Sequence, residues 1–142
     1  MLQHYSVILN IDIETYQRDG PLLNEFVHPG IKIKSMSIDK IEKFVDDEIV
    51  LLTKKELDTV CYKEKEITFI ESRSQFHQGF TKTFKNSKGF TVREMFNIIV
   101  EFEEEARPLS NWFGGIDAHH IYFEGLREYP DKKNSYMISW GS

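Results

Sequence analysis

The alternation of apolar and polar residues predicts a chain rich in strands. Over residues 5–13 every second residue is apolar, which is the period of a strand with one buried face. Turn-forming residues over 17–30 predict a loop after it. Short runs of β-favouring residues between turn signals predict further strands. These are expected at residues 31–36, 67–70, 76–84, 116–124 and 136–140, with a polar connection at 129–134.

Apolar residues at helical spacing predict a helix early in the chain. Ser37 is a suitable N-cap for it, and Asp39 falls in its first turn, where the helix dipole favours an acid. Its apolar face would consist of Ile38, Ile41, Phe44 and Val45. The pattern leaves open whether residues 49–52 continue this helix or form a buried strand.

Two capping boxes predict two further helix starts. Thr53 is followed by Glu56, and Thr91 by Glu94, which is the Thr-x-x-Glu spacing of the motif. The first box predicts a short helix over residues 54–62. The second opens the clearest helix of the chain, which should stop just before Pro108. Its core-facing stripe would be Val92, Met95, Ile99, Phe102 and Ala106.

Strands and helices that mix without regular β-α-β alternation predict an α+β fold. The expectation is a single domain over residues 1–142, with a mainly antiparallel sheet and two or three helices packed on one face. The length suits one domain. Hydrophobic residues make up 40% and charged residues 29%, a composition typical of a soluble globular protein.

Charge and cysteine content narrow the functional classes. The net charge of -5 argues against general binding to nucleic acid, whose phosphates demand a basic surface. A single cysteine, Cys61, allows no internal disulfide and is expected to be a small buried residue. No stretch has the pattern of a signal peptide or a membrane span, so a cytoplasmic protein without membrane contact is expected.

The window of residues 112–126 concentrates the candidate chemistry. On a strand, Asp117 and His119 would share one face, and His120 and Glu124 the other. An imidazole oriented by a carboxylate is the usual arrangement for a general base or a metal ligand. One hypothesis is therefore an acid/base or metal-dependent enzyme that uses this window.

A divalent metal would be held here by His119, His120 and Asp117. A zinc site would need a further ligand from elsewhere, such as His28, His77 or Cys61. The alternative is structural, since a histidine on a half-buried strand often only bonds a neighbour. The fixed-spacing metal signatures His-Glu-x-x-His and Cys-x-x-Cys are absent from the sequence.

Aromatic residues near the C-terminus predict a surface for a ligand or partner. These residues are Trp112, Phe113, Tyr122 and Trp140. Trp140 would be either docked into the core or offered to a partner, and the shared strand face with Tyr136 and Ile138 favours docking.

Two charged segments have both a functional and a structural interpretation. Lysines and phenylalanines interleave over residues 79–90, as in proteins that bind single-stranded nucleic acid. The acidity of the chain favours the other interpretation, with Phe80 and Phe84 in the core. The acidic run over residues 101–105 is interpreted as a solvated helix face.

No mechanism-bearing motif occurs in the sequence. The leading hypothesis is therefore a small binding or interaction domain that catalyses no reaction. Its partner would be a protein or a small molecule, and a homodimer through a sheet edge is one form that it could take.

Overall fold

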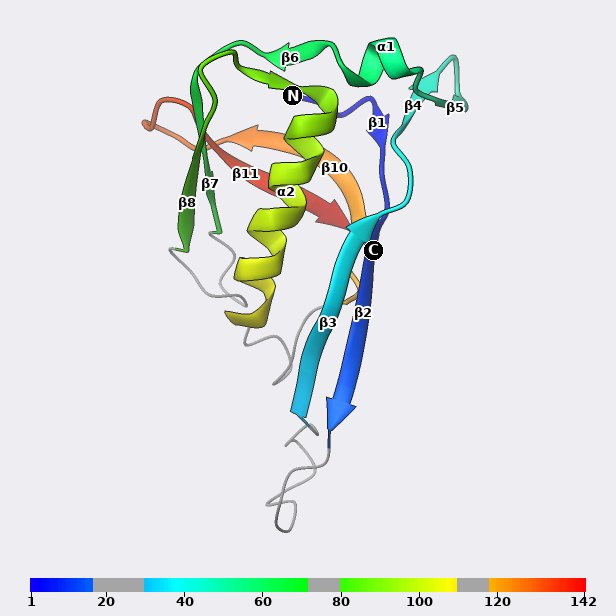
Figure 1. The fold of residues 1–142 in the computed structure, drawn as a ribbon, viewed down its shortest axis with the longest axis vertical. Helices are drawn as coiled ribbons and strands as arrows, with labels where there is room; N and C mark the ends of the chain where they lie inside the picture. Colours follow the sequence, from blue (N-terminus) through cyan, green and yellow to red (C-terminus); the bar gives the residue numbers. More distant parts are fainter. Residues whose placement is uncertain (17–29, 72–79, 110–117) are drawn as a thin grey trace.

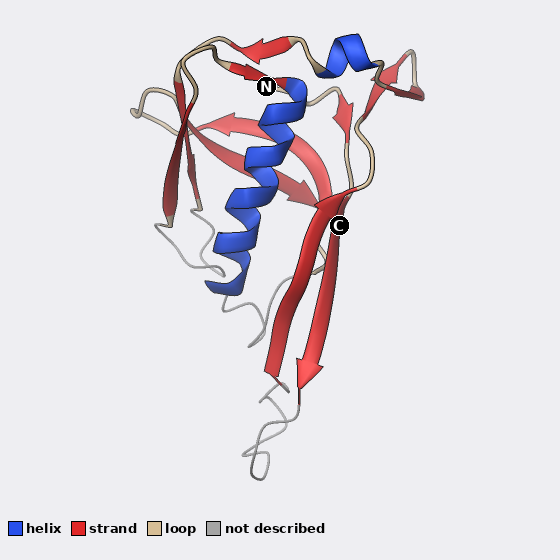
Figure 2. Ribbon diagram, in the orientation of Figure 1, coloured by secondary structure: helices blue, strands red, loops and turns tan. Residues whose placement is uncertain are grey.

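The described chain is mostly β, and one long helix lies across its strands (Figure 2). The computed structural model describes residues 1–16, 30–71, 80–109 and 118–142. The strands are β1 (Tyr5–Ser6), β2 (Leu9–Tyr16), β3 (Gly30–Ile38), β4 (Glu42–Val45), β5 (Glu48–Leu51), β6 (Val60–Tyr62), β7 (Glu66–Ile70), β8 (Thr81–Lys85), β9 (Phe90–Thr91), β10 (Tyr122–Glu128) and β11 (Ser135–Gly141). The helices are α1 (Lys54–Leu57), α2 (Val92–Ala106) and the 3-10 turn η1 (Arg107–Leu109).

The main sheet has the strand order β10-β11-β7-β8. Its pairs are antiparallel except β11 with β7, which is parallel. The N-terminal segment lies along the other side of β10. There the Phe123 N–H donates to the Val7 carbonyl and the Leu9 N–H to the Ile121 carbonyl, both at 2.9 Å. This pairing joins the main sheet to the β2–β3 hairpin.

Helix α2 packs its apolar stripe against these strands. In Figure 1 it crosses β10 and β11, with β7 and β8 to one side and β2 and β3 to the other. Phe96 meets Phe123 of β10 at 5.0 Å between ring centroids, and Phe102 meets Phe69 of β7 at 5.6 Å. The five residues of the expected stripe are all buried, which confirms the helix and its core-facing side.

The expected α+β fold, with two or three helices packed on one face, is wrong. In the described residues α2 is the one long helix, and α1 is a single turn. Both capping boxes are present as predicted. A capping box fixes where a helix begins and not how far it runs, and the chain leaves α1 after Leu57. Residues 60–62 then form β6, which pairs with β9.

The predicted helix at residues 38–45 is also wrong. β3 continues to Ile38, and β4 forms a hairpin with β5. The two-residue turn between them holds Asp46 at φ 50° and Asp47 at φ 65°. Positive φ at both positions matches the strand twist of a tight hairpin. The apolar spacing suited a helix, but pairing with β1 and β5 determined the outcome.

The last strands follow the prediction with a shift. β10 begins at Tyr122 rather than at residue 116, so residues 118–121 precede it. β11 and the polar connection are where they were expected. Of the predicted strand 76–84, residues 76–79 lie outside the described residues, and β8 covers residues 81–84. None of the helices in the described segments has the length and apolarity to cross a membrane.

Candidate functional site

The residues of the predicted histidine site lie before and within β10. His119 is exposed and His120 is half-buried, and both precede the strand. The strand alternation that paired His119 with Asp117 therefore does not apply to residues 118–121. Glu124 is exposed on β10, and its carboxylate covers Gly141 of β11. A Cβ placed on Gly141 would lie 2.8 Å from that carboxylate, so the glycine makes room for Glu124. Asp117, Trp112 and Phe113 fall outside the described residues.

A buried ion pair lies against the histidine segment. The Arg107 Nε donates to Glu103 Oε2 at 2.9 Å, and the two side chains are 2% and 1% exposed. The Arg107 Nη2 donates to the backbone carbonyl of His120 at 2.7 Å. The other Glu103 oxygen accepts from the indole N–H of Trp140 at 2.5 Å. The end of α2 thus holds both β11 and the chain entering β10.

In this network, the Trp140 indole and the backbone carbonyl of His120 each have a hydrogen-bond partner in the protein. Trp140 is buried, with the Arg107 guanidinium 5.3 Å from its ring centre. In the described residues, no buried side-chain nitrogen or oxygen lacks a hydrogen-bond partner. Tyr122 differs from Trp140, since nearly half of its surface is exposed at the start of β10. Of the four predicted partner-binding aromatics, it is the one that the structure places at the surface of the described chain.

The described residues contain no cluster of metal-binding side chains. No three histidine, cysteine, aspartate or glutamate side chains there are placed to hold an ion. Of the further ligands named from the sequence, Cys61 is on β6, and His28 and His77 lie in undescribed segments.

The segment of alternating lysine and phenylalanine faces α2. Phe84 is buried, and the half-buried Phe80 meets Phe102 at 5.4 Å. Lys82 forms ion pairs with Glu101 at 3.3 Å and Glu105 at 2.6 Å. The acidic run is therefore not a uniform solvated face. Two of its members bind Lys82, and Glu103 is in the core.

Cys61 is half-buried on β6, where burial raises the pKa of its thiol from 9.0 to about 11. Folding thus favours the protonated thiol. This contribution to stability is complete below the unfolded pKa and is lost as the pH rises toward about 11.

We expect iodoacetamide to alkylate Cys61 about 100-fold more slowly in the folded protein than in urea at neutral pH, because the thiolate is the nucleophile. Mass spectrometry against time gives both rates, and no other cysteine competes. The folded rate should keep rising up to a pH of about 11. Equal rates in the two states would contradict the assignment.

Two of the cavities lined by described residues bear on the candidate site. One of about 430 Å³ lies between α2 and residues 36–41, with apolar walls that include Ile38, Phe96 and Val100. Its rim residue Arg93 is paired with Asp58 at 3.2 Å. Another of about 330 Å³ includes Glu124 and Trp140 among its lining residues. The second cavity is thus the one of the two that contains predicted site residues.

The β4–β5 hairpin exposes apolar side chains. Phe44 and Ile49 lie opposite each other in the register, and Leu51 follows on the same face. Their exposed fractions are 50%, 54% and 61%. In the sheet β1-β4-β5, β5 is the edge strand, and every one of its residues is exposed. Figure 1 places this hairpin at a corner of the molecule, away from α2.

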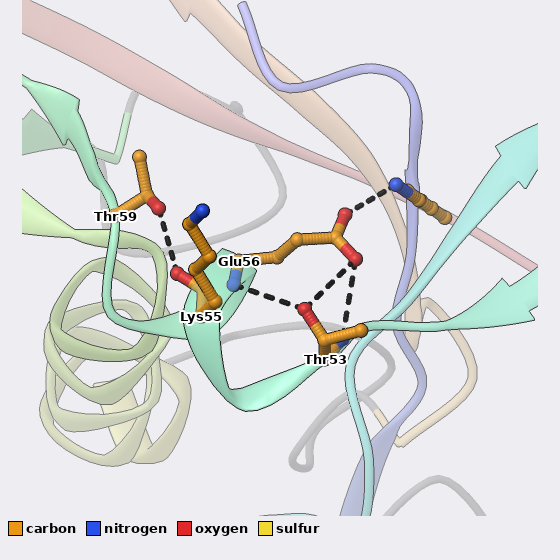
Figure 3. Close-up of polar contacts among 5 residues, drawn as sticks. Thr53, Lys55, Glu56 and Thr59 are labelled. Carbon is orange, nitrogen blue, oxygen red and sulfur yellow. Dashed lines mark hydrogen bonds and ion pairs between the residues drawn. The ribbon is translucent and has the colours of Figure 1, made fainter.

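Glu56 of α1 holds the hairpin in place (Figure 3). Its carboxylate accepts from the backbone N–H of Thr53 at 3.2 Å, which closes the capping box, and from the Lys43 ammonium of β4. The Lys43 contact, more than the cap, lowers the pKa of Glu56. The Thr59 hydroxyl, which follows α1, donates to the Lys55 carbonyl at 2.7 Å and so satisfies a carbonyl of the helical turn.

The exposed hairpin residues were not predicted as a site from the sequence. Residues 49–52 were expected to form either a buried strand or a continuation of the helix to which Phe44 and Val45 were assigned. The available signal was two β-favouring pairs, Phe44-Val45 and Ile49-Val50, separated by acidic residues that can form a tight turn.

Comparisons with protein-family models, with curated proteins and with solved structures find no match to this chain.

Proposed function

We propose that this protein is a binding domain whose β4–β5 hairpin is the surface for a protein partner. The observation that carries the proposal is the exposed apolar face of this hairpin. Its strand β5 lies at the edge of the sheet, and among the described residues no strand pairs with its outer side. Scattered single apolar side chains are normal on a surface, whereas a contiguous group of them is typical of an interaction site.

The backbone of β5 suits a partner that adds a strand. The Leu52 N–H donates to the Ile41 carbonyl at 3.3 Å. This bond shows which residues of β5 direct their N–H and C=O groups toward β4, and we call this alternation the backbone phase of the hairpin. Because this phase alternates along an antiparallel strand, Ile49 and Leu51 point their N–H and C=O groups away from β4. Main-chain groups along such an edge provide affinity, and the flanking side chains provide selectivity.

The expected homo-oligomer is one form of this contact. The enzyme hypothesis for Asp117, His119, His120 and Glu124 stays a prediction from the sequence, because Asp117 lies outside the described residues. A small-molecule ligand also stays a prediction.

A photo-cross-linking amino acid at Ile49, introduced in the native cells, tests the proposal. We expect a discrete adduct from this position, and we expect it to disappear when Leu51 is also changed to serine. Glu104, exposed on α2, is the matched control position and should give no such adduct. No adduct from position 49, or the same products from both positions, would contradict the proposal.

A further inference from the structure

We infer that the partner of the hairpin is a second copy of this chain, with the two β5 strands paired antiparallel about a two-fold axis. This inference rests on the proposed function, since it names the partner of the same surface. Three features of β5 support it, namely its backbone phase, its apolar face and the charges at its two ends.

The backbone phase selects one register. A two-fold axis through Val50 places Ile49 of each copy opposite Leu51 of the other. These are the residues whose N–H and C=O groups point outward, so each such pair can exchange two hydrogen bonds. The register therefore uses the outward groups of both residues and joins the two hairpins into one continuous sheet.

The same register joins the apolar faces. Ile49 and Leu51 lie on the face that carries Phe44, so the exposed side chains of the two copies form one row across the axis. On the opposite face, Val50 is 40% exposed and meets its own counterpart, where the strands approach more closely. Apolar surface on both faces of the hairpin is thereby removed from water.

The charges select the antiparallel direction. Asp46 and Asp47 precede β5 and Glu48 begins it, whereas Lys54 and Lys55 follow it, and all five are exposed. None of the ion pairs found in the described residues engages the acidic group Asp46, Asp47 and Glu48 or the two lysines. Antiparallel pairing brings the acidic end of each β5 near the basic end of the other, twice across the axis. A parallel pair would bring like charges together.

A different protein would have to carry the same order of acidic, apolar and basic residues along an extended segment. A second copy supplies this order by itself. One short strand pair covers less than the roughly 1,600 Å² of a standard interface, so the association is concentration-dependent.

Variants in which the charge at one end of β5 is reversed test the antiparallel arrangement. In sedimentation velocity over roughly three decades of concentration, the wild-type protein should shift from monomer to dimer. The acidic variant carries Lys54→Glu and Lys55→Glu. The basic variant carries Asp46→Asn, Asp47→Asn and Glu48→Lys, and its asparagines keep the positive φ of the turn. Each variant alone should associate at least about tenfold more weakly than the wild type, because like charges then face each other.

Mixing the two variants should restore the dimer, because their charges are complementary. The matched control carries Lys132→Glu and Lys133→Glu, the same charge change on the exposed β10–β11 connection, and should associate like the wild type. Near-ultraviolet circular dichroism shows that each variant is folded.

A wild-type protein that stays monomeric throughout overturns the inference, as does a mixture of variants that fails to associate. A monomeric protein together with a cross-linked adduct of another mass at position 49 would overturn the second copy as partner. The proposed function would survive that result, so the two failures are distinguishable.

Discussion

Replacing Arg107 with methionine is expected to lower the free energy of unfolding by about 3–5 kcal/mol, because it leaves a buried carboxylate without its partner. Glu103 is almost fully covered and would keep one neutral donor, the Trp140 indole N–H. The His120 carbonyl would lose a donor as well. Urea titration followed by tryptophan fluorescence measures the loss, and Trp140 is one of the two tryptophans in the chain.

Two further variants separate the effect of burial from the effect of charge on the free energy of unfolding. Lys82→Met removes a surface lysine that also pairs with glutamates of α2, and it should cost less than about 1 kcal/mol. The double variant with Glu103→Gln and Arg107→Met should recover part of the Arg107→Met loss. Its neutral amide needs no counter-charge and can still accept from Trp140. If Arg107→Met cost no more than Lys82→Met, the account of a buried ion pair would be refuted.

Truncating Phe102 to alanine is expected to cost about 3–5 kcal/mol, since a buried aromatic ring is lost and a cavity stays behind. Phe102 is buried in α2, with the rings of Phe69 and Phe80 at 5.6 Å and 5.4 Å. These contacts join β7 and the residue that precedes β8 to the helix. The loss is measured as a lower midpoint in urea with an unchanged slope.

Phe44→Ala is the matched control for this truncation. The same ring is half exposed on β4, so its removal should change the stability of the monomer by no more than about 0.5 kcal/mol. It should instead weaken the self-association of the hairpin. Equal losses for Phe44→Ala and Phe102→Ala would show that Phe44 packs into the core and is not available to a partner.

Local signals predicted the parts of the fold that depend on neighbouring residues. Helix α2 has a cap at Thr91, a stripe of apolar residues and a proline after its end, and each acts within a few positions. Both capping boxes were predicted for the same reason. The strict alternation at residues 5–13 likewise predicted the strand structure found in β1 and β2 and the burial of Tyr5, Val7 and Leu9.

The errors occur where distant residues decide the structure. Residues 38–45 fit a helical period, but β4 is a strand because β1 and β5 pair with it from both sides. Glu103 belongs by sequence to an acidic run, and only the folded chain shows that Arg107 and Trp140 meet it. The candidate interaction surface was missed because exposure of an apolar edge is a property of the sheet order. No local pattern encodes that order.

The pairing of the N-terminal segment with β10 has a consequence for synthesis of the protein. The Met1 ammonium group donates to the Leu126 carbonyl across 125 positions of sequence, and Val7 pairs with Phe123 in the same ladder. On the ribosome, β1 can pair with β4 as soon as residues 42–45 have been made. The edge of residues 7–9 that bonds β10, by contrast, stays open until residues 121–123 have been made. Contacts of such separation fold slowly. Until β10 arrives, this edge has no strand beside it, and an unpaired strand edge is prone to aggregation in a nascent chain.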